Sequence, residues 1–162
     1  MENIEYEISF KPNSIKTIIE YCEENGFIKE SVTKQNRIVF QNNNNINIIA
    51  RLTTDFIKDK EIITFDFKNI GERNKNLKVA TESLPLNVLP KDKECILSML
   101  RVLEFYEAAN NLRTRYVYKK DNVKFEIDDY TRPVMKVVGI EGKKEEVEQV
   151  YKHVLSKNNL VN

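Results

Sequence analysis

The feature that most constrains this chain is a strict alternation of apolar and polar residues near its start. Residues 4–11, which read IEYEISFK, show it most clearly. Successive side chains of a β-strand point to opposite faces of a sheet, so this pattern predicts a strand with one apolar face and one charged face. Further strand-like segments lie near residues 35–40, 46–54, 61–68, 78–84, 112–119, 123–128 and 135–140.

Three helical segments interrupt the predicted strands. The first lies between Pro12 and Gly26, the second runs from about Asp92 to Glu107, and the third follows Gly142. Apolar residues recur in each at intervals of three and four, which is typical of helices with one buried face. Short strands with hairpin-sized gaps favour an antiparallel sheet or barrel with helices outside it. The polar segment 69–76 is predicted to be a loop.

Length and charge limit the classes of function. The 162 residues suit one domain, and no linker-like shift in composition divides them. The 26 basic and 25 acidic residues nearly cancel, which argues against a protein that coats nucleic acid or a membrane by bulk charge. No signal pattern and no apolar run of roughly 20 residues is present, so a cytoplasmic location is the default expectation.

The sequence also excludes several common chemistries. With four glycines there is neither a GxGxxG nor a GxxxxGK[ST] motif, so any phosphate must be held by side chains. A single histidine permits no histidine-based triad or metal cluster.

Charged side chains share one face of several predicted strands. On any one strand such a face usually points to water. If the strands close into a barrel, one face must point inward, and a charged interior is expensive unless it serves a ligand. An anionic ligand with divalent cations satisfies both signs of charge. The shared faces hold Glu5, Glu7 and Ser9; Arg51 and Thr53; Thr64, Asp66 and Lys68; Arg113 and Arg115; and Lys124, Glu126 and Asp128.

An ordered set of these positions resembles the CYTH family, the triphosphate tunnel metalloenzymes. This family includes class IV adenylate cyclases, thiamine triphosphatases and inorganic triphosphatases. Residues 5–9 (EYEIS) resemble its ExExK signature, and residues 139–142 (GIEG) its EIEG element. The positions that match in between are Arg51 of an RxR strand, Lys68, Glu82 of an RxExE-like strand, Arg113 and Arg115 of a KxR pair, and Asp128.

The resemblance implies an α+β fold, a closed antiparallel eight-stranded barrel with helices packed outside, formed by one CYTH-like domain over 1–162. It implies Mg²⁺ or Mn²⁺ on Glu5, Glu7 and Glu141, and phosphate contacts from Arg51, Lys68, Arg113 and Arg115. Glu5, Glu7 and Arg115 would be the catalytic residues. Glu82 and Asp128 would be either metal-side or structural.

Four positions depart from the family pattern. Ser9 replaces the signature lysine, Thr53 the second arginine of RxR, Ala80 one acid of RxExE, and Gly139 the first glutamate of EIEG. Two basic and two acidic charges are therefore lost together. This balance fits an altered ligand site that is retained, and it also fits a lineage that has given up catalysis.

Two functions from different classes follow. The first is metal-dependent binding and hydrolysis of inorganic triphosphate, thiamine triphosphate or a nucleoside triphosphate. The second is a non-catalytic CYTH-like module that senses a nucleotide or polyphosphate or mediates a protein interaction. A third interpretation is an α+β domain of unrelated function, in which the charged strand faces point to solvent.

Overall fold

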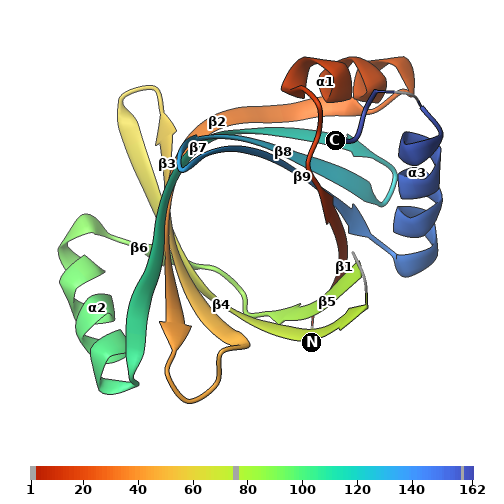
Figure 1. Ribbon diagram of the computed structural model, residues 1–162. Helices are drawn as coiled ribbons and strands as arrows, with labels where there is room; N and C mark the ends of the chain where they lie inside the picture. The colour runs from red at the N-terminus through yellow and green to blue at the C-terminus, as the bar shows by residue number, and fades with distance from the viewer. Residues whose placement is uncertain (1–2, 75–76, 158) are drawn as a thin grey trace.

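The structure is a computed structural model that describes residues 3–74, 77–157 and 159–162; the side chains of residues 3–5 and 72–74 lie outside this description. Its strands and helices follow each other in an order close to the predicted one (Figure 1). They are β1 (Asn3–Phe10), α1 (Ile15–Glu24), β2 (Ile28–Asn42), β3 (Ile48–Ile57), β4 (Lys60–Asn74), β5 (Leu77–Glu82), β6 (Leu86–Val88), α2 (Lys93–Val102), β7 (Phe105–Lys120), β8 (Val123–Arg132), β9 (Val134–Gly142) and α3 (Lys144–Ser156).

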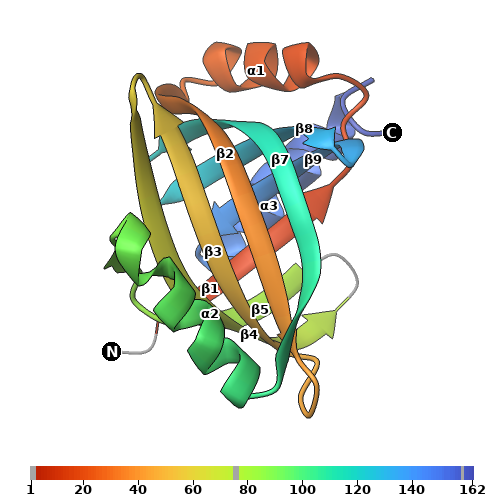
Figure 2. The ribbon, with the colours of Figure 1, turned by 90° about the vertical axis from the view of Figure 1, so that its left-hand side faces the viewer.

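Eight of these strands close into an antiparallel barrel. The strand order is β3-β2-β7-β8-β9-β1-β5-β4, and β3 pairs with β4 to complete the ring. The short strand β6 adds to β4 outside the ring. Figure 1 looks along the barrel axis, and Figure 2 shows the long strands from the side. The predicted fold class is confirmed, with β6 as an additional strand.

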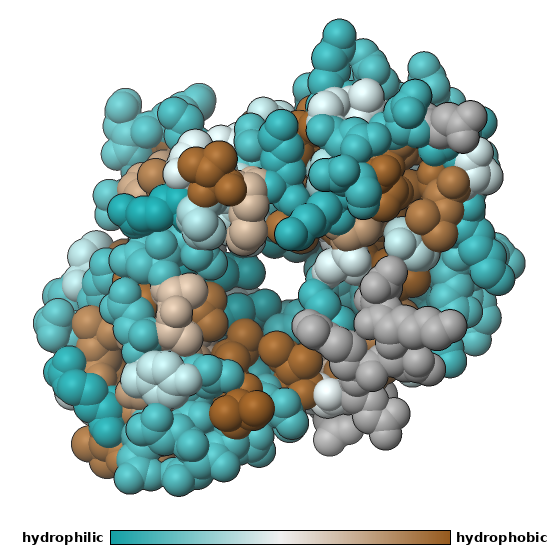
Figure 3. Space-filling view, viewed as in Figure 1, coloured by the Kyte–Doolittle hydropathy of each residue, from teal (hydrophilic) through white to brown (hydrophobic). Residues whose placement is uncertain are grey.

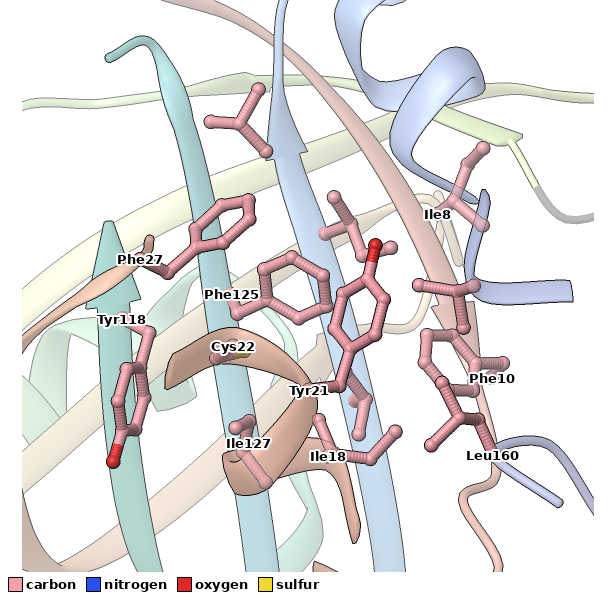
Figure 4. Close-up of a cluster of buried hydrophobic side chains, with 14 of the residues drawn as sticks. Ile8, Phe10, Ile18, Tyr21, Cys22, Phe27, Tyr118, Phe125, Ile127 and Leu160 are labelled. Atoms are coloured by element: carbon pink, nitrogen blue, oxygen red, sulfur yellow. The ribbon is translucent and has the colours of Figure 1, made fainter. Parts of the chain in front are cut away.

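The larger hydrophobic core lies outside the barrel wall, because the apolar faces of the strands point outward. α1 and α3 lie on the same side of the ring in Figure 1 and cover that part of the wall. Phe125 and Ile127 of β8 are fully buried there, as are Ile18 and Cys22 of α1. Figure 4 shows the rings of Phe27, Phe125 and Tyr21 among these side chains.

A second core lies beneath α2, on the opposite side of the ring. Ile96 and Leu100 of the helix pack there with Leu52 and Phe40 of the strands. Because both cores face outward, the lumen is left to the polar side of each strand. Tyr118 shows the division on one strand: it is buried outside the wall, while Arg113 and Arg115 line the lumen.

Local side chains fix the starts and turns of these elements. Ser14 caps α1, its hydroxyl accepting a hydrogen bond from the Thr17 amide at 3.1 Å. The asparagine run between β2 and β3 is a turn, in which Asn42 Oδ1 accepts from the amides of Asn44 and Asn45. Among the described helices, none combines the length and the apolar character that crossing a membrane requires.

Two predicted boundaries were wrong. Residues 69–74 continue strand β4 instead of forming a loop, and 75–76 lie outside the described residues. The second helix ends at Val102, and β7 begins at Phe105, where a helix to Glu107 was expected. Glu104 has a φ of +60°, which ends the helix and redirects the chain into the longest strand of the barrel.

Candidate functional site

The lumen of the barrel is a cavity of about 420 Å³, lined almost entirely by polar and charged side chains. All eight strands of the ring contribute to it. The space-filling view, taken along the barrel axis, shows an opening in the middle of the molecule with polar residues around it (Figure 3). Its charged lining within the described residues consists of Arg37, Arg51, Lys68, Lys78, Arg113, Arg115 and Lys124 with Glu7, Asp66, Glu82, Glu126, Asp128 and Glu141.

Strands β1 and β9 bring two of the predicted metal-side acids together. Glu7 pairs directly opposite Glu141, so both side chains project from the same face into the lumen. Lys78 Nζ lies 3.1 Å from Glu7 Oε1, and Lys124 Nζ lies 2.5 Å from Glu141 Oε2. Burial raises the pKa of Glu7, but Lys78, the Ser9 hydroxyl and Lys68 outweigh it and hold that pKa below its ordinary value. Glu7 is therefore a carboxylate at neutral pH.

Strands β3, β4 and β5 carry a second group of ion pairs. Arg51 binds Asp66 with two nitrogens, at 2.8 and 2.6 Å, and also approaches Glu82 at 3.1 Å. Lys68 lies 2.9 Å from Glu82 and 3.6 Å from Glu7. Burial lowers the pKa of Arg51, but the two acids outweigh this effect and raise it overall.

Strands β7 and β8 carry the third group, which centres on Asp128. Arg115 donates to both of its carboxylate oxygens, at 2.7 and 2.8 Å, and also pairs with Glu126. Arg113 donates to Asp128 at 3.0 Å, to Tyr130 at 2.7 Å and to Gln35 at 3.0 Å. Arg113 is only 4% exposed, and its Nη2 is buried with no hydrogen-bond partner among the described residues.

Arg37 of β2 differs from the other cations of the lumen. Its Nε donates to Thr53 Oγ1 at 3.0 Å, and it forms no ion pair with a carboxylate among the described residues. Burial and the nearby guanidinium groups of Arg113, Arg115 and Arg51 lower the pKa of Arg37 to about 9. Among the described residues, Arg37 is therefore the one lumen cation without a carboxylate in direct contact.

The structure brings eight of the nine predicted site residues into one cavity. They are Glu7, Arg51, Lys68, Glu82, Arg113, Arg115, Asp128 and Glu141. The ninth, Glu5, lies on β1 opposite Ala80, but its side chain lies outside the described residues. Sequence reasoning did not single out Arg37, although the period of two along β2 places a lone arginine on one face of that strand.

Cations from neighbouring strands stand beside two of the positions that depart from the family pattern. Lys78 of β5 donates to Ser9 Oγ at 2.8 Å, so an ammonium group lies where the signature lysine is missing. Arg37 of β2 pairs opposite Thr53 and donates to it, next to the missing arginine of RxR. On the acidic side, Glu126 of β8 pairs opposite Gly139. At these three positions, therefore, a neighbouring strand supplies a charged side chain of the same sign as the one in the family pattern.

The described residues do not assemble a metal centre. No group of three or more histidine, cysteine, aspartate or glutamate side chains suited to a metal ion comes together within the described part of the chain. Glu7 and Glu141 lie side by side, but each already contacts a lysine ammonium group. A divalent cation at these acids would share them with the two lysines, and Mg²⁺ or Mn²⁺ stays a prediction.

Comparison with known proteins identifies structures with the same fold, but no sequence relative. No protein-family model matches the sequence, and neither does any curated protein sequence. Among solved structures, a protein from Pyrococcus horikoshii OT3 is 20% identical with a TM-score of 0.74, covering 99% of this chain and 94% of that one.

Two other solved structures share the fold at lower identity. A candidate adenylyl cyclase from Hippeastrum with a dominant triphosphatase activity is 12% identical with a TM-score of 0.66, covering 96% of this chain and 87% of that one. A chain of the Schizosaccharomyces pombe Mediator head module is 8% identical with a TM-score of 0.72, covering 99% and 98%. The chain therefore shares its fold with a protein that has triphosphatase activity and with a chain of the Mediator head module, and CYTH membership stays a prediction.

Proposed function

We propose that this protein binds a triphosphate-bearing small molecule in the lumen of its barrel and hydrolyses it. The observation that carries the proposal is the charged lumen itself, in which seven basic side chains meet around a cavity of about 420 Å³. That volume lies within the usual range of small-molecule sites. The same lining holds six carboxylates, so a polyanion accompanied by a divalent cation would match both signs of charge. Charge-assisted hydrogen bonds to phosphate gain strength where water is excluded.

Four cations are the proposed phosphate contacts: Arg51, Lys68, Arg113 and Arg115. Each is already held by a carboxylate of a neighbouring strand. These ion pairs fix the direction of the side chains before a ligand arrives, which lowers the entropic cost of binding it. Glu82 and Asp128 act in this account as the acids that orient cations.

Hydrolysis is proposed to use Glu5, Glu7 and Arg115. Glu7 is ionised and lines the lumen, so it can accept a hydrogen bond from the attacking water molecule. The water oxygen forms a bond to the terminal phosphorus, the bond from that phosphorus to the bridging oxygen breaks, and the remaining diphosphate part leaves. The proton lost by the water passes to the phosphate products or to solvent. Arg115 and its neighbours would neutralise the charge that spreads over the phosphoryl oxygens. Glu5, Glu7 and Glu141 are the proposed ligands of Mg²⁺ or Mn²⁺, and the assay below is therefore run with and without each ion.

Phosphate release tests the proposal directly. Tripolyphosphate, thiamine triphosphate and ATP are supplied in turn, with Mg²⁺, with Mn²⁺ or with a chelator. We expect turnover that falls by about a hundredfold or more in Glu7→Gln. Glu24→Gln, which changes an exposed carboxylate of α1, is the matched control and should keep full activity. No release above the metal-only blank would contradict hydrolysis.

A second candidate function is binding without turnover. It is favoured by the saturation of Arg115, whose Nε, Nη1 and Nη2 all contact carboxylates, and by the serine in place of the signature lysine. A module of this kind would bind tripolyphosphate or a nucleotide and release no phosphate. A binding isotherm without phosphate release distinguishes it from the enzyme, and a protein-interaction module would show neither.

A further inference from the structure

Arg37 stands alone among the lumen cations. Every other cation of the described lining has a carboxylate within 3.1 Å; for example, Lys78 contacts Glu7 at that distance. Arg37 has only the Thr53 hydroxyl, on its Nε, which leaves its two terminal nitrogens without a partner among the described residues. A guanidinium group has five donors, and most of those on Arg37 are unused.

The surroundings of Arg37 make this an expensive arrangement for an empty protein. The positive charges of Arg113, Arg115 and Arg51 repel that of Arg37, and the attraction of Glu126 on β8 does not balance them. Burial acts in the same direction, so the pKa of Arg37 falls to about 9. A partly buried charge that has no carboxylate partner among the described residues costs stability, and such costs are found where a protein awaits a ligand.

A second unused donor lies beside Arg37 on the adjacent strand. Gln35 pairs opposite Arg113 and Arg37 opposite Asn111, so Arg37 and Arg113 are diagonal neighbours on β2 and β7. Long side chains in such positions reach each other. Arg113 is held on three sides by Asp128, Tyr130 and Gln35, and its remaining nitrogen, Nη2, is buried without a partner among the described residues. An orphan donor on so firmly held a side chain points to an absent acceptor.

We infer that Arg37 and Arg113 form a subsite on the β2–β7 wall that binds one phosphate group of the ligand without a metal ion. The inference rests on the proposed function: it locates one phosphate group of the ligand in the lumen and adds Arg37 to the residues that bind it. One tetrahedral oxyanion would accept hydrogen bonds from the terminal nitrogens of Arg37, and a small shift of the Arg113 side chain would bring its buried Nη2 within reach of the same group. The acids Glu7 and Glu141 belong to other strands, β1 and β9, and the donors of the subsite are all arginine nitrogens, so the subsite itself contains no ligand for a metal ion.

Calorimetric titration with tripolyphosphate in EDTA tests this subsite. We expect the wild type to bind, and Arg37→Gln to bind about ten- to a hundredfold more weakly, as loss of a charged hydrogen-bond donor implies. Arg37→Lys should recover part of the affinity. Arg101→Gln removes an exposed arginine of α2 and should bind as the wild type does.

The outcomes separate the subsite from the proposed function. A wild type that fails to bind tripolyphosphate with or without Mg²⁺ overturns the proposed function and the subsite together. Binding that Arg37→Gln retains in full, or that requires Mg²⁺ in the wild type, overturns the subsite alone.

Thermal unfolding shows whether Arg37→Gln is still folded, so that a loss of binding can be assigned to the missing side chain. Arg37→Gln removes a charge from a cationic cluster, so we expect its Tm to equal that of the wild type or to exceed it by roughly 2–4 °C. A variant that gains stability and loses tripolyphosphate binding cannot have lost binding through misfolding. A Tm well below that of the wild type would contradict an uncompensated Arg37 and overturn the subsite.

Discussion

Some carboxylates of the lumen each form ion pairs with two cations. Glu126 of β8 contacts Arg115 of β7 and lies 3.1 Å from Lys124. Burial raises the pKa of Glu126, but Arg115 and Lys124 outweigh it and lower the pKa from 4.5 to about 2. The native state therefore binds a proton at this carboxylate less readily than the unfolded chain does.

This shift predicts a specific loss of stability in acid. Because the folded pKa of Glu126 lies below the unfolded value, its contribution is complete above pH 4.5 and is lost as the pH falls toward 2. In Glu126→Gln we expect a loss of about 3–5 kcal/mol at pH 7, since Arg115 and Lys124 each lose a buried partner. The measurement is urea unfolding between pH 7 and pH 3.

The pH dependence supplies the control. The variant should lose less stability than the wild type between pH 4.5 and pH 3, because the titrating group is gone. Parallel curves for the two proteins would show that Glu126 is not stabilised by its cations.

The sequence could predict most lumen residues because their role follows from alternation. Glu7, Arg113 and Arg115 lie on strands whose polar faces are plainly charged, and all three line the cavity. Arg37 was missed because one arginine on a strand is usually solvated, and only ring closure turns it inward. That Arg37 has no carboxylate partner among the described residues depends on side chains of other strands, which a local sequence pattern cannot reveal.

At the scale of elements, β9 contains two glycines with different tolerance of a side chain. A Cβ at Gly142 would lie 2.7 Å from the carbonyl oxygen of Asn122, on a backbone with a φ of +155°. A Cβ at Gly139 would meet its nearest atom, Glu7 Oε1, at 3.5 Å, an ordinary contact. The end of β9 therefore requires glycine, and its centre does not.

We expect Gly142→Ala to lower the free energy of unfolding by about 1–3 kcal/mol, because the backbone at Asn122 or β9 must shift. Gly139→Ala is the control within the same strand and should stay within about 0.5 kcal/mol of the wild type. Chemical denaturation of both variants measures the difference. Equal losses at the two positions would contradict the close approach at Gly142.

Element types could be predicted more reliably than element ends. Apolar spacing located all three helices, and the predicted strand-like segments overlap the strands of the ring. Residues 69–74 are too polar to suggest a strand, yet ladder pairing with β5 holds Asn69 and Ile70 in one. Leu103 continues the apolar spacing of α2, but the backbone turns at Glu104 into β7. In both places long-range pairing overrides the local pattern.

At the scale of the whole molecule, the barrel reverses the usual distribution of polarity. Its apolar residues lie outside the wall beneath three helices, and its lumen is charged. The helices bury the apolar outer faces of the strands, and this burial stabilises the fold. The lumen therefore does not need an apolar core and can contain ion pairs. A polyanion bound there would complete the charge balance around Arg37 and stabilise the native state.

The location of a bound polyanion tests this account most directly. A crystal structure of the protein with tripolyphosphate should show the phosphate groups in the lumen, with one of them between Arg37 and Arg113. Tripolyphosphate bound only on the outer surface, with the lumen filled by solvent, would contradict the central claim that the charged tunnel is the ligand site.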